Sequence, residues 1–248
     1  MKINSKFEYV VDKSYKLFKA EYDTNDLPDK IHKKWHNGLI ENVTYYAEFN
    51  SEDIRNKRYI LHLNTELFEK KIMEVKAILY HEFTHLLDGI TYGYLCEDEY
   101  KNLIASYSEI HASYIESKAL YDTMHSNEYL TNKINDKYLC SINLYTQYAK
   151  DSNPLTFMSA LTWTFYYMGY SLFMEEIDTK YKIQFKGFPE EYFNDLDVIY
   201  TCIKATEKRK ESANKLMLTT YNLLVKSALL KYKKHQTERM ENILDTIL

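Results

Sequence analysis

Glycine and proline are scarce in this chain, which has 5 Gly and 3 Pro among 248 residues. β-Sandwiches and barrels need many turns built from such residues, and doubly wound α/β folds usually need glycine-rich loops between strand and helix. Hydrophobic residues make up 45% of the chain, which is enough for a buried core and far from the composition of a disordered protein. The composition therefore predicts an α+β fold that is mostly α, with long helices and few connections.

The first half of the chain alternates between helical and strand-like patterns. Apolar residues recur at helical spacing over 5–22, 65–88 and 98–124, and each of these segments is expected to be a helix. Two runs rich in β-branched and aromatic residues, 43–49 and 58–63, lie between the first two helices. They predict a small sheet that contains an antiparallel pair.

The second half of the chain predicts helices only. The polar stretch 126–136 is expected to be a connection, and the helices are expected at 138–150, 154–177, 189–208 and 212–246. The span 155–174 carries no charge and is long enough to cross a bilayer, but Thr, Ser, Tyr and Gly fill nearly half of it. We therefore expect a central buried helix and no membrane association.

Charge and cysteine content restrict the partners and the compartment. The net charge is −4, and it divides into −5 for residues 1–124 and +1 for residues 125–248. Ten Lys or Arg lie between Lys204 and Arg239, a pattern typical of a solvated helix face that leaves a protein partner of this half as a candidate. A nucleic-acid partner is not expected. The three cysteines form no CxxC pair, and the N-terminus has no secretory pattern, so we expect a cytoplasmic protein.

The strongest chemical signal is the HExxH motif, from His81 through Glu82 to His85. On a helix, residues four apart share a face, so the two imidazoles can bind one Zn²⁺. Glu82 lies beside that face, where its carboxylate can take a proton from a zinc-bound water and act as general base. Gly89 is expected just beyond the end of this helix, at C′.

A catalytic zinc normally has three protein ligands and a water. The next helix offers Glu109 and His111, which are two residues apart and point to nearly opposite sides, so only one of them can face the metal. Other side chains are candidates to hydrogen-bond the metal ligands from behind. These candidates are Asp88, three residues after His85, and Ser113 and Glu116, which share a helix face with Glu109.

With these residues the first half of the sequence resembles the gluzincin zinc metallopeptidases, and it is similar to the minimal gluzincins and the ImmA/IrrE-type peptidases. In gluzincins the HExxH helix is followed by a helix with a glutamate ligand, in several branches with alanine three positions later, as in Glu109 and Ala112. The resemblance implies a zincin-like fold and Zn²⁺ held by His81, His85 and Glu109. It also implies that the strand at 60–64 is an edge strand along which a peptide binds.

The predicted protein is thus a zinc endopeptidase that cleaves a protein or peptide substrate. Residues 1–124 are expected to form its zincin-like domain, and residues 125–248 a helical domain or subdomain. One feature departs from the family pattern, because Asn102 stands where some gluzincins have an oxyanion-stabilising tyrosine. The alternative is a zinc-binding regulatory or interaction module with little proteolytic activity, whose basic helical half docks a partner or nucleic acid.

Overall fold

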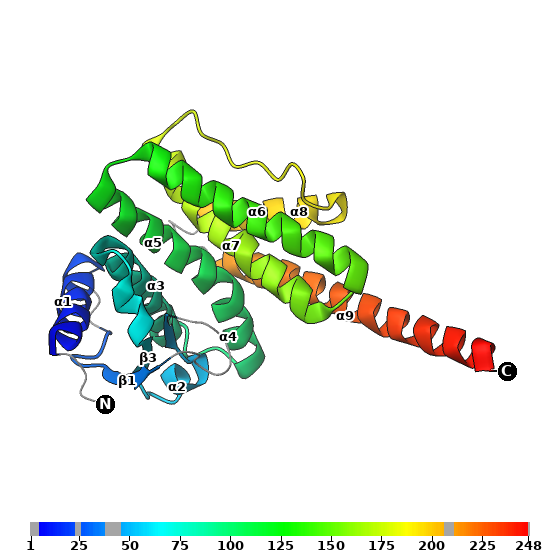
Figure 1. Cartoon of the computed structure of the whole chain (residues 1–248), viewed down its shortest axis with the longest axis horizontal. Helices are drawn as coiled ribbons and strands as arrows, with labels where there is room; N and C mark the ends of the chain where they lie inside the picture. Colours follow the sequence, from blue (N-terminus) through cyan, green and yellow to red (C-terminus); the bar gives the residue numbers. More distant parts are fainter. Residues whose placement is uncertain (1–4, 23–25, 38–45, 206–210, 248) are drawn as a thin grey trace.

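The structure, a computed structural model, describes residues 5–22, 26–37, 46–205 and 211–247. It is mostly helical, with one small sheet close to the N-terminal helix (Figure 1). The expectation of an α+β fold that is mostly α is confirmed.

Within the described residues the sheet has three strands in the order β1-β3-β2, which are β1 (His32–His36), β3 (Ile60–Asn64) and β2 (Ala47–Phe49). Strand β2 is antiparallel to β3, as predicted, whereas β1 is parallel to β3. The sequence does not reveal β1, because HKKWH contains a single apolar residue and no alternating pattern. Residues 43–45 of the predicted strand lie outside the described residues.

The prediction that residues 60–64 form an edge strand is wrong. Because β1 pairs along one side of β3 and β2 along the other, both of its backbone hydrogen-bonding edges are occupied. The edge strand nearest the HExxH helix is β2, which packs against α3.

Helix α3 (Ile72–Thr91) carries the HExxH motif and packs against α1 (Ser5–Tyr22), β2 and α5 (Glu109–Met124). A 3₁₀ turn, Thr65–Glu69, occupies the start of the predicted helix. Gly89 lies inside α3, so its placement beyond the helix end is wrong. A Cβ on Gly89 would lie 2.8 Å from Ile54 Cγ2 and 3.0 Å from the Tyr100 hydroxyl. Close packing of α2 (Ser51–Arg55) and α4 (Glu97–Leu103) therefore accounts for this glycine.

The helix predicted over 98–124 is helical throughout but is not uniform. It comprises α4 (Glu97–Leu103), a π-helical turn (Ile104–Ser108) and α5 (Glu109–Met124). A π-turn adds a residue to a helical turn and changes which side chains face a neighbouring helix, and such turns are frequent at functional sites. Here the turn ends directly before Glu109.

The described residues of the second half form four α-helices and a 3₁₀ turn at Glu190–Tyr192. The α-helices are α6 (Asn127–Asp151), α7 (Pro154–Ile177), α8 (Phe193–Ala205) and α9 (Glu211–Ile247). The expected connection at 126–136 is wrong, because Ser126 caps the Tyr129 N–H at 3.2 Å and begins α6 there. Leu130 and Ile134, one turn apart, are buried along it. The end of the helix predicted at 189–208 lies outside the described residues.

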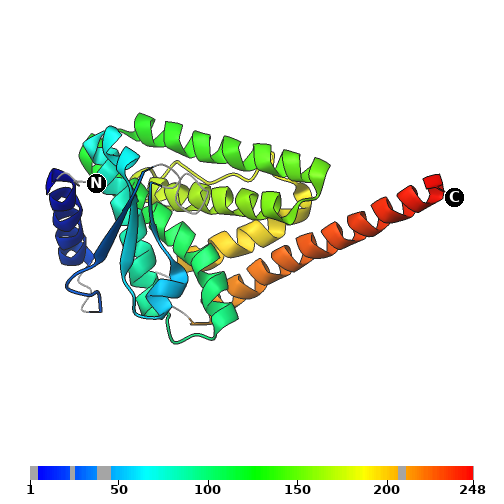
Figure 2. The same ribbon diagram turned by 60° about the horizontal axis from the view of Figure 1, so that its bottom comes forward.

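Helix α7 is the central helix, with α5 along one side and α6 along another, and its bounds match the prediction (Figure 2). Among the described residues, no helix is long and apolar enough to cross a membrane. The C-terminal part of α9 extends away from the other helices in both views.

Helices α5 and α7 touch at Gly169. A Cβ on this residue would lie 2.4 Å from the Ile110 carbonyl oxygen and 2.6 Å from Ser113 Cβ, so the two helices approach too closely for any side chain. One hydrophobic cluster runs from Val11 to Ala228 and includes residues on both sides of the predicted boundary at 124. The division into two domains stays a prediction.

Candidate metal centre

The two histidines of the motif converge on one point. His81 and His85 lie one turn apart on α3, and their Nε2 atoms are 3.1 Å from each other. Both residues are buried, with 7% and 8% of their surface exposed. The helical spacing therefore directs the two imidazoles toward the same site, as the motif predicts.

Glu109 of α5 completes a group of three. Its Oε2 lies 3.6 Å from His81 Nε2 and 3.7 Å from His85 Nε2, and it is buried without a hydrogen-bond partner in the described part of the chain. A triangle with sides of 3.1, 3.6 and 3.7 Å has its centre about 2.0 Å from each corner, which is the Zn–N and Zn–O bond length. The three atoms therefore fit a divalent metal ion, and two imidazoles with one carboxylate form a known catalytic zinc set.

The other nitrogen of each imidazole has its own partner. His81 Nδ1 lies 3.0 Å from the Glu116 carboxylate, and His85 Nδ1 lies 2.8 Å from the Ser108 hydroxyl. Such contacts fix the ring orientation and leave Nε2 available to a metal. Glu116 is thus placed where the sequence predicted a supporting residue, whereas Ser108 was not predicted.

The remaining candidates have different partners. The Asp88 carboxylate is buried and accepts hydrogen bonds from His111 Nδ1 at 3.0 and 3.1 Å, so neither residue belongs to the group of three. The Ser113 side chain packs against Gly169 of α7, and its hydroxyl has no hydrogen-bond partner among the described residues. Of the two possible third ligands, the structure therefore brings Glu109 to the histidines and turns His111 toward Asp88.

The helical second half contributes side chains to the site. The Tyr166 ring of α7 lies edge-on to the His81 ring at 5.5 Å, and its hydroxyl hydrogen-bonds Glu109. One turn further on, Tyr170 lies close to Glu116 and helps to lower the pKa of its carboxyl group. Lys137 of α6 lies over both tyrosine rings, at 5.0 and 5.5 Å from their centroids. The site is therefore built from both halves of the sequence.

Glu82 connects the site to the sheet. Its Oε2 accepts the backbone N–H of Phe49 at 3.1 Å, at the end of β2. Burial raises the pKa of Glu82 to about 8, the His81 charge opposes this shift, and Glu109 adds to it. A carboxyl group with a pKa near neutrality can both accept and donate a proton.

The charges of the other groups are tightly linked. Burial opposes protonation of His81, but the carboxylates of Glu109, 3.6 Å from its Nε2, and of Glu116, 3.0 Å from its Nδ1, raise its pKa to about 10. Burial lowers the pKa of His85 to about 4, against the attraction of Glu109. Although burial opposes ionisation of Glu116, its hydrogen bond with His81 lowers its pKa to about 2. At neutral pH and without a bound metal, these shifts leave His81 as a cationic imidazolium and His85 as a neutral imidazole.

Comparison with known proteins does not extend this description. No protein-family model, no curated protein and no solved structure matches the chain. The function must therefore be argued from the site itself.

The structure adds five side chains that sequence reasoning missed, which are Ser108, Lys137, Tyr166, Tyr170 and Tyr221. Burial raises the pKa of Tyr221 of α9 to about 12, and the nearby charge of Glu109 adds to the shift. Tyr166 and Tyr170 are four residues apart in the uncharged span 155–174 of α7, and this spacing places both on one face. The pattern does not say which helix that face meets.

Proposed function

We propose that this protein is a zinc-dependent endopeptidase. The observation that carries the proposal is the convergence of His81 Nε2, His85 Nε2 and Glu109 Oε2 about a common centre, next to Glu82. A buried carboxylate oxygen without a hydrogen-bond partner is costly unless a cation or donor compensates for it. The order of sheet, HExxH helix and glutamate-bearing helix supports a zincin-like first half.

Different side chains have different roles in the proposed peptide cleavage. When bound, Zn²⁺ supplies a polarised carbonyl and a water of lowered pKa. Glu82 accepts the proton of the attacking water and returns it to the leaving amine, and its raised pKa suits both steps. Tyr166, beside His81 and bonded to Glu109, is our candidate to donate a hydrogen bond to the oxyanion, in place of the tyrosine replaced by Asn102.

Strand β2 is our candidate to align the substrate. The Asn64 N–H donates to the Tyr46 carbonyl at 2.9 Å, which fixes the alternation of hydrogen bonds between β2 and β3. That alternation directs the backbone N–H and C=O of Ala47 and Phe49 away from β3, and of these groups the Phe49 N–H already donates to Glu82. An extended peptide can pair with this edge and pass directly by Glu82.

A second candidate function, a metal-binding interaction module, is favoured by one feature of α9. Leu216, Leu223 and Leu230 recur every seven residues and are 51%, 60% and 58% exposed. An apolar stripe of this kind, beside exposed Lys226 and Lys233, fits a partner helix. Zinc-loaded protein that cleaves no peptide would favour this function over the first.

We also propose that the protein is located in the reducing environment of the cytoplasm. Cys96, Cys140 and Cys202 are all free thiols, and Cys96 is exposed. Exposed thiols of this kind persist in reducing compartments.

The test compares zinc-loaded protein with Glu82→Gln in a digest of a mixed peptide library, followed by mass spectrometry. We expect Glu82→Gln to keep about one zinc and the native circular dichroism spectrum, while cleavage falls at least about 100-fold. Glu99→Gln, at an exposed glutamate of α4, is the matched control and should cleave normally. Full proteolysis by Glu82→Gln would show that the mechanism is wrong.

A further inference from the structure

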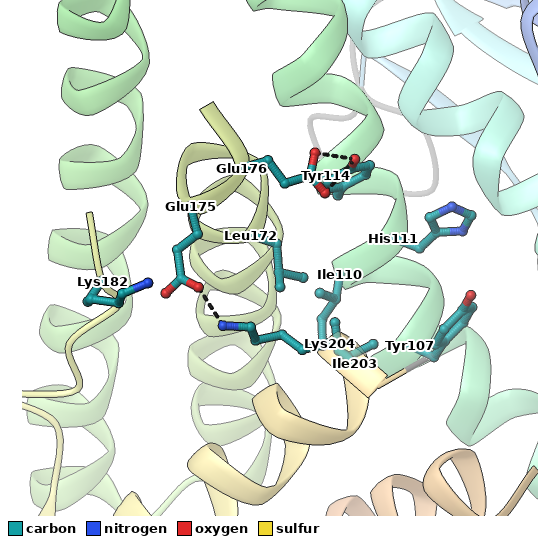
Figure 3. Close-up of a pocket in the computed structure, with 10 residues that line it drawn as sticks. All are labelled: Tyr107, Ile110, His111, Tyr114, Leu172, Glu175, Glu176, Lys182, Ile203 and Lys204. Atoms are coloured by element: carbon teal, nitrogen blue, oxygen red, sulfur yellow. Dashed lines mark hydrogen bonds and ion pairs between the residues drawn. The ribbon is translucent and has the colours of Figure 1, made fainter. Parts of the chain in front are cut away.

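A cavity of about 490 Å³ lies between α5, α7, α8 and the connection that follows α7 (Figure 3). It does not include His81, His85 or Glu109. Its volume is in the range of small-molecule sites, which bury most of the ligand surface against apolar walls and fix its orientation with a few polar groups.

The middle of the cavity is apolar. Ile110, Leu172 and Ile203 come from three different helices and meet between the charged groups of the rim, as Figure 3 shows. Ile110 and Ile203 are buried, and Leu172 is half-buried. This floor fits an apolar side chain.

Glu175, the acidic group at one end of the cavity, already accepts hydrogen bonds from within the protein. Glu175 accepts from Lys204 Nζ at 2.5 Å and from the Ile183 N–H at 3.1 Å, so both of its oxygens are occupied. Because of these bonds and the nearby Lys182, its pKa is lowered although burial opposes the shift. This end of the cavity therefore has two lysines for one carboxylate.

The two lysines at this end of the cavity have N–H donors that do not bond to Glu175. An ammonium group has three N–H donors, and Lys204 uses one of them on Glu175. Lys182 makes no hydrogen bond with any residue that the structure describes. The Glu175 carboxylate lies between the two lysines in Figure 3, so a ligand carboxylate would lie beside it and accept the N–H donors that the two lysines leave unused, which gives two carboxylates for two lysines.

The opposite rim offers acceptors. Both oxygens of Glu176 lie 2.8–2.9 Å from the single hydroxyl of Tyr114, so one O–H serves two acceptor atoms. Glu176 is exposed and can accept a further N–H. A ligand that carries a carboxylate at one end and an amide or amine N–H at the other matches both rims.

We propose that this cavity binds the C-terminal end of a short peptide with an apolar last side chain and a free carboxylate. Lys182 and Lys204 bind the carboxylate, the floor of Ile110, Leu172 and Ile203 holds the side chain, and Glu176 accepts a peptide N–H. The site needs neither the metal nor peptide cleavage, so it stands apart from the proposed function.

In the experiment, N-acetyl-Leu-Leu is titrated into the full chain. Its C-terminal amide, which lacks the carboxylate charge, is the control ligand. Glu82→Gln protein with a chelator is used, so that neither cleavage nor a metal-bound carboxylate contributes. Methyl NMR of isoleucine reports directly on Ile110 and Ile203. Lys182→Met removes the proposed contact, and Lys180→Met, at an exposed lysine of the same connection, is the matched control.

We expect saturable shifts of the Ile110 and Ile203 methyl signals with the free acid, and binding weakened about tenfold or more for the amide. Lys182→Met should weaken binding of the acid at least about fivefold, whereas Lys180→Met should leave it unchanged. Absence of saturable binding up to about 5 mM would overturn the proposal. Equal affinity for acid and amide, or equal effects of the two lysine variants, would also overturn it.

Discussion

Glu116 accepts a hydrogen bond from His81 Nδ1 at 3.0 Å, seven residues along α5 from Glu109, which lies at the other nitrogen of the same ring. One helix therefore contacts both sides of the imidazole. Tyr170 and Lys137 lie close to the Glu116 carboxylate in turn, and both help to lower its pKa. The orientation of His81 is thus set by contacts from α5, α6 and α7.

The first prediction concerns the hydrogen bond between Glu116 and His81. Glu116→Ala should weaken zinc binding about 10- to 100-fold, because His81 loses the partner that orients its ring and raises its basicity. Ser113→Ala, on the same helix but packed against Gly169, should change zinc affinity less than about twofold. Competition with a chromophoric chelator measures both values. Equal effects of the two variants would contradict the role assigned to Glu116.

The third ligand is the subject of the second prediction. Glu109→Gln should reduce zinc affinity at least about 100-fold, because the anionic oxygen that faces both Nε2 atoms is replaced by an uncharged amide. His111→Gln should retain about one zinc, because His111 is bonded to Asp88 and faces away from the histidine pair. Metal content by mass spectrometry after dialysis distinguishes the two. Loss of zinc from His111→Gln with retention in Glu109→Gln would reverse our assignment.

The pH dependence of metal binding gives a third prediction. At neutral pH His81, with its pKa at about 10, carries a proton that zinc must displace, whereas His85, with its pKa at about 4, is already neutral. Zinc affinity should therefore rise with pH, about tenfold per unit between pH 6 and 8, with release of about one proton. The Glu82→Gln background is preferable, because Glu82 titrates near pH 8. Calorimetry in buffers of different ionisation enthalpy counts the protons, and a pH-independent affinity would refute this charge assignment.

A fourth prediction tests the contact between the two halves. Gly169→Ala should lower the free energy of unfolding by about 1–3 kcal/mol. The added methyl group would overlap Ile110 and Ser113 and push α5 away from α7. Zinc affinity should also fall, since Glu109 and Glu116 are both on α5. Ser159→Ala, at an exposed position of α7, is the control. Chemical denaturation measures the stability, and a variant as stable as the control would show that the helices adjust freely.

The sequence predicted those features that depend on one element at a time. Helical spacing of apolar residues predicted the bounds of α1, since one face of it must be buried whatever it packs against. The uncharged run after Pro154 predicted the central buried helix α7. The HExxH spacing places His81 and His85 on one face of α3 by helix geometry alone. The capping residue Ser126 was present in the sequence too, but the polar residues after it concealed the start of α6.

Only the tertiary structure decided how these elements meet. The polar strand β1 is held by pairing with β3, and that pairing makes β3 the central strand and β2 the edge. The choice of Glu109 over His111 depends on the packing of α5 against α3 after the π-turn. The contributions of Tyr166 and Lys137 depend on how closely α7 approaches α5 at Gly169. Periodicity reports which side of a helix is buried, whereas the identity of its neighbour is fixed by contacts between residues far apart in the chain.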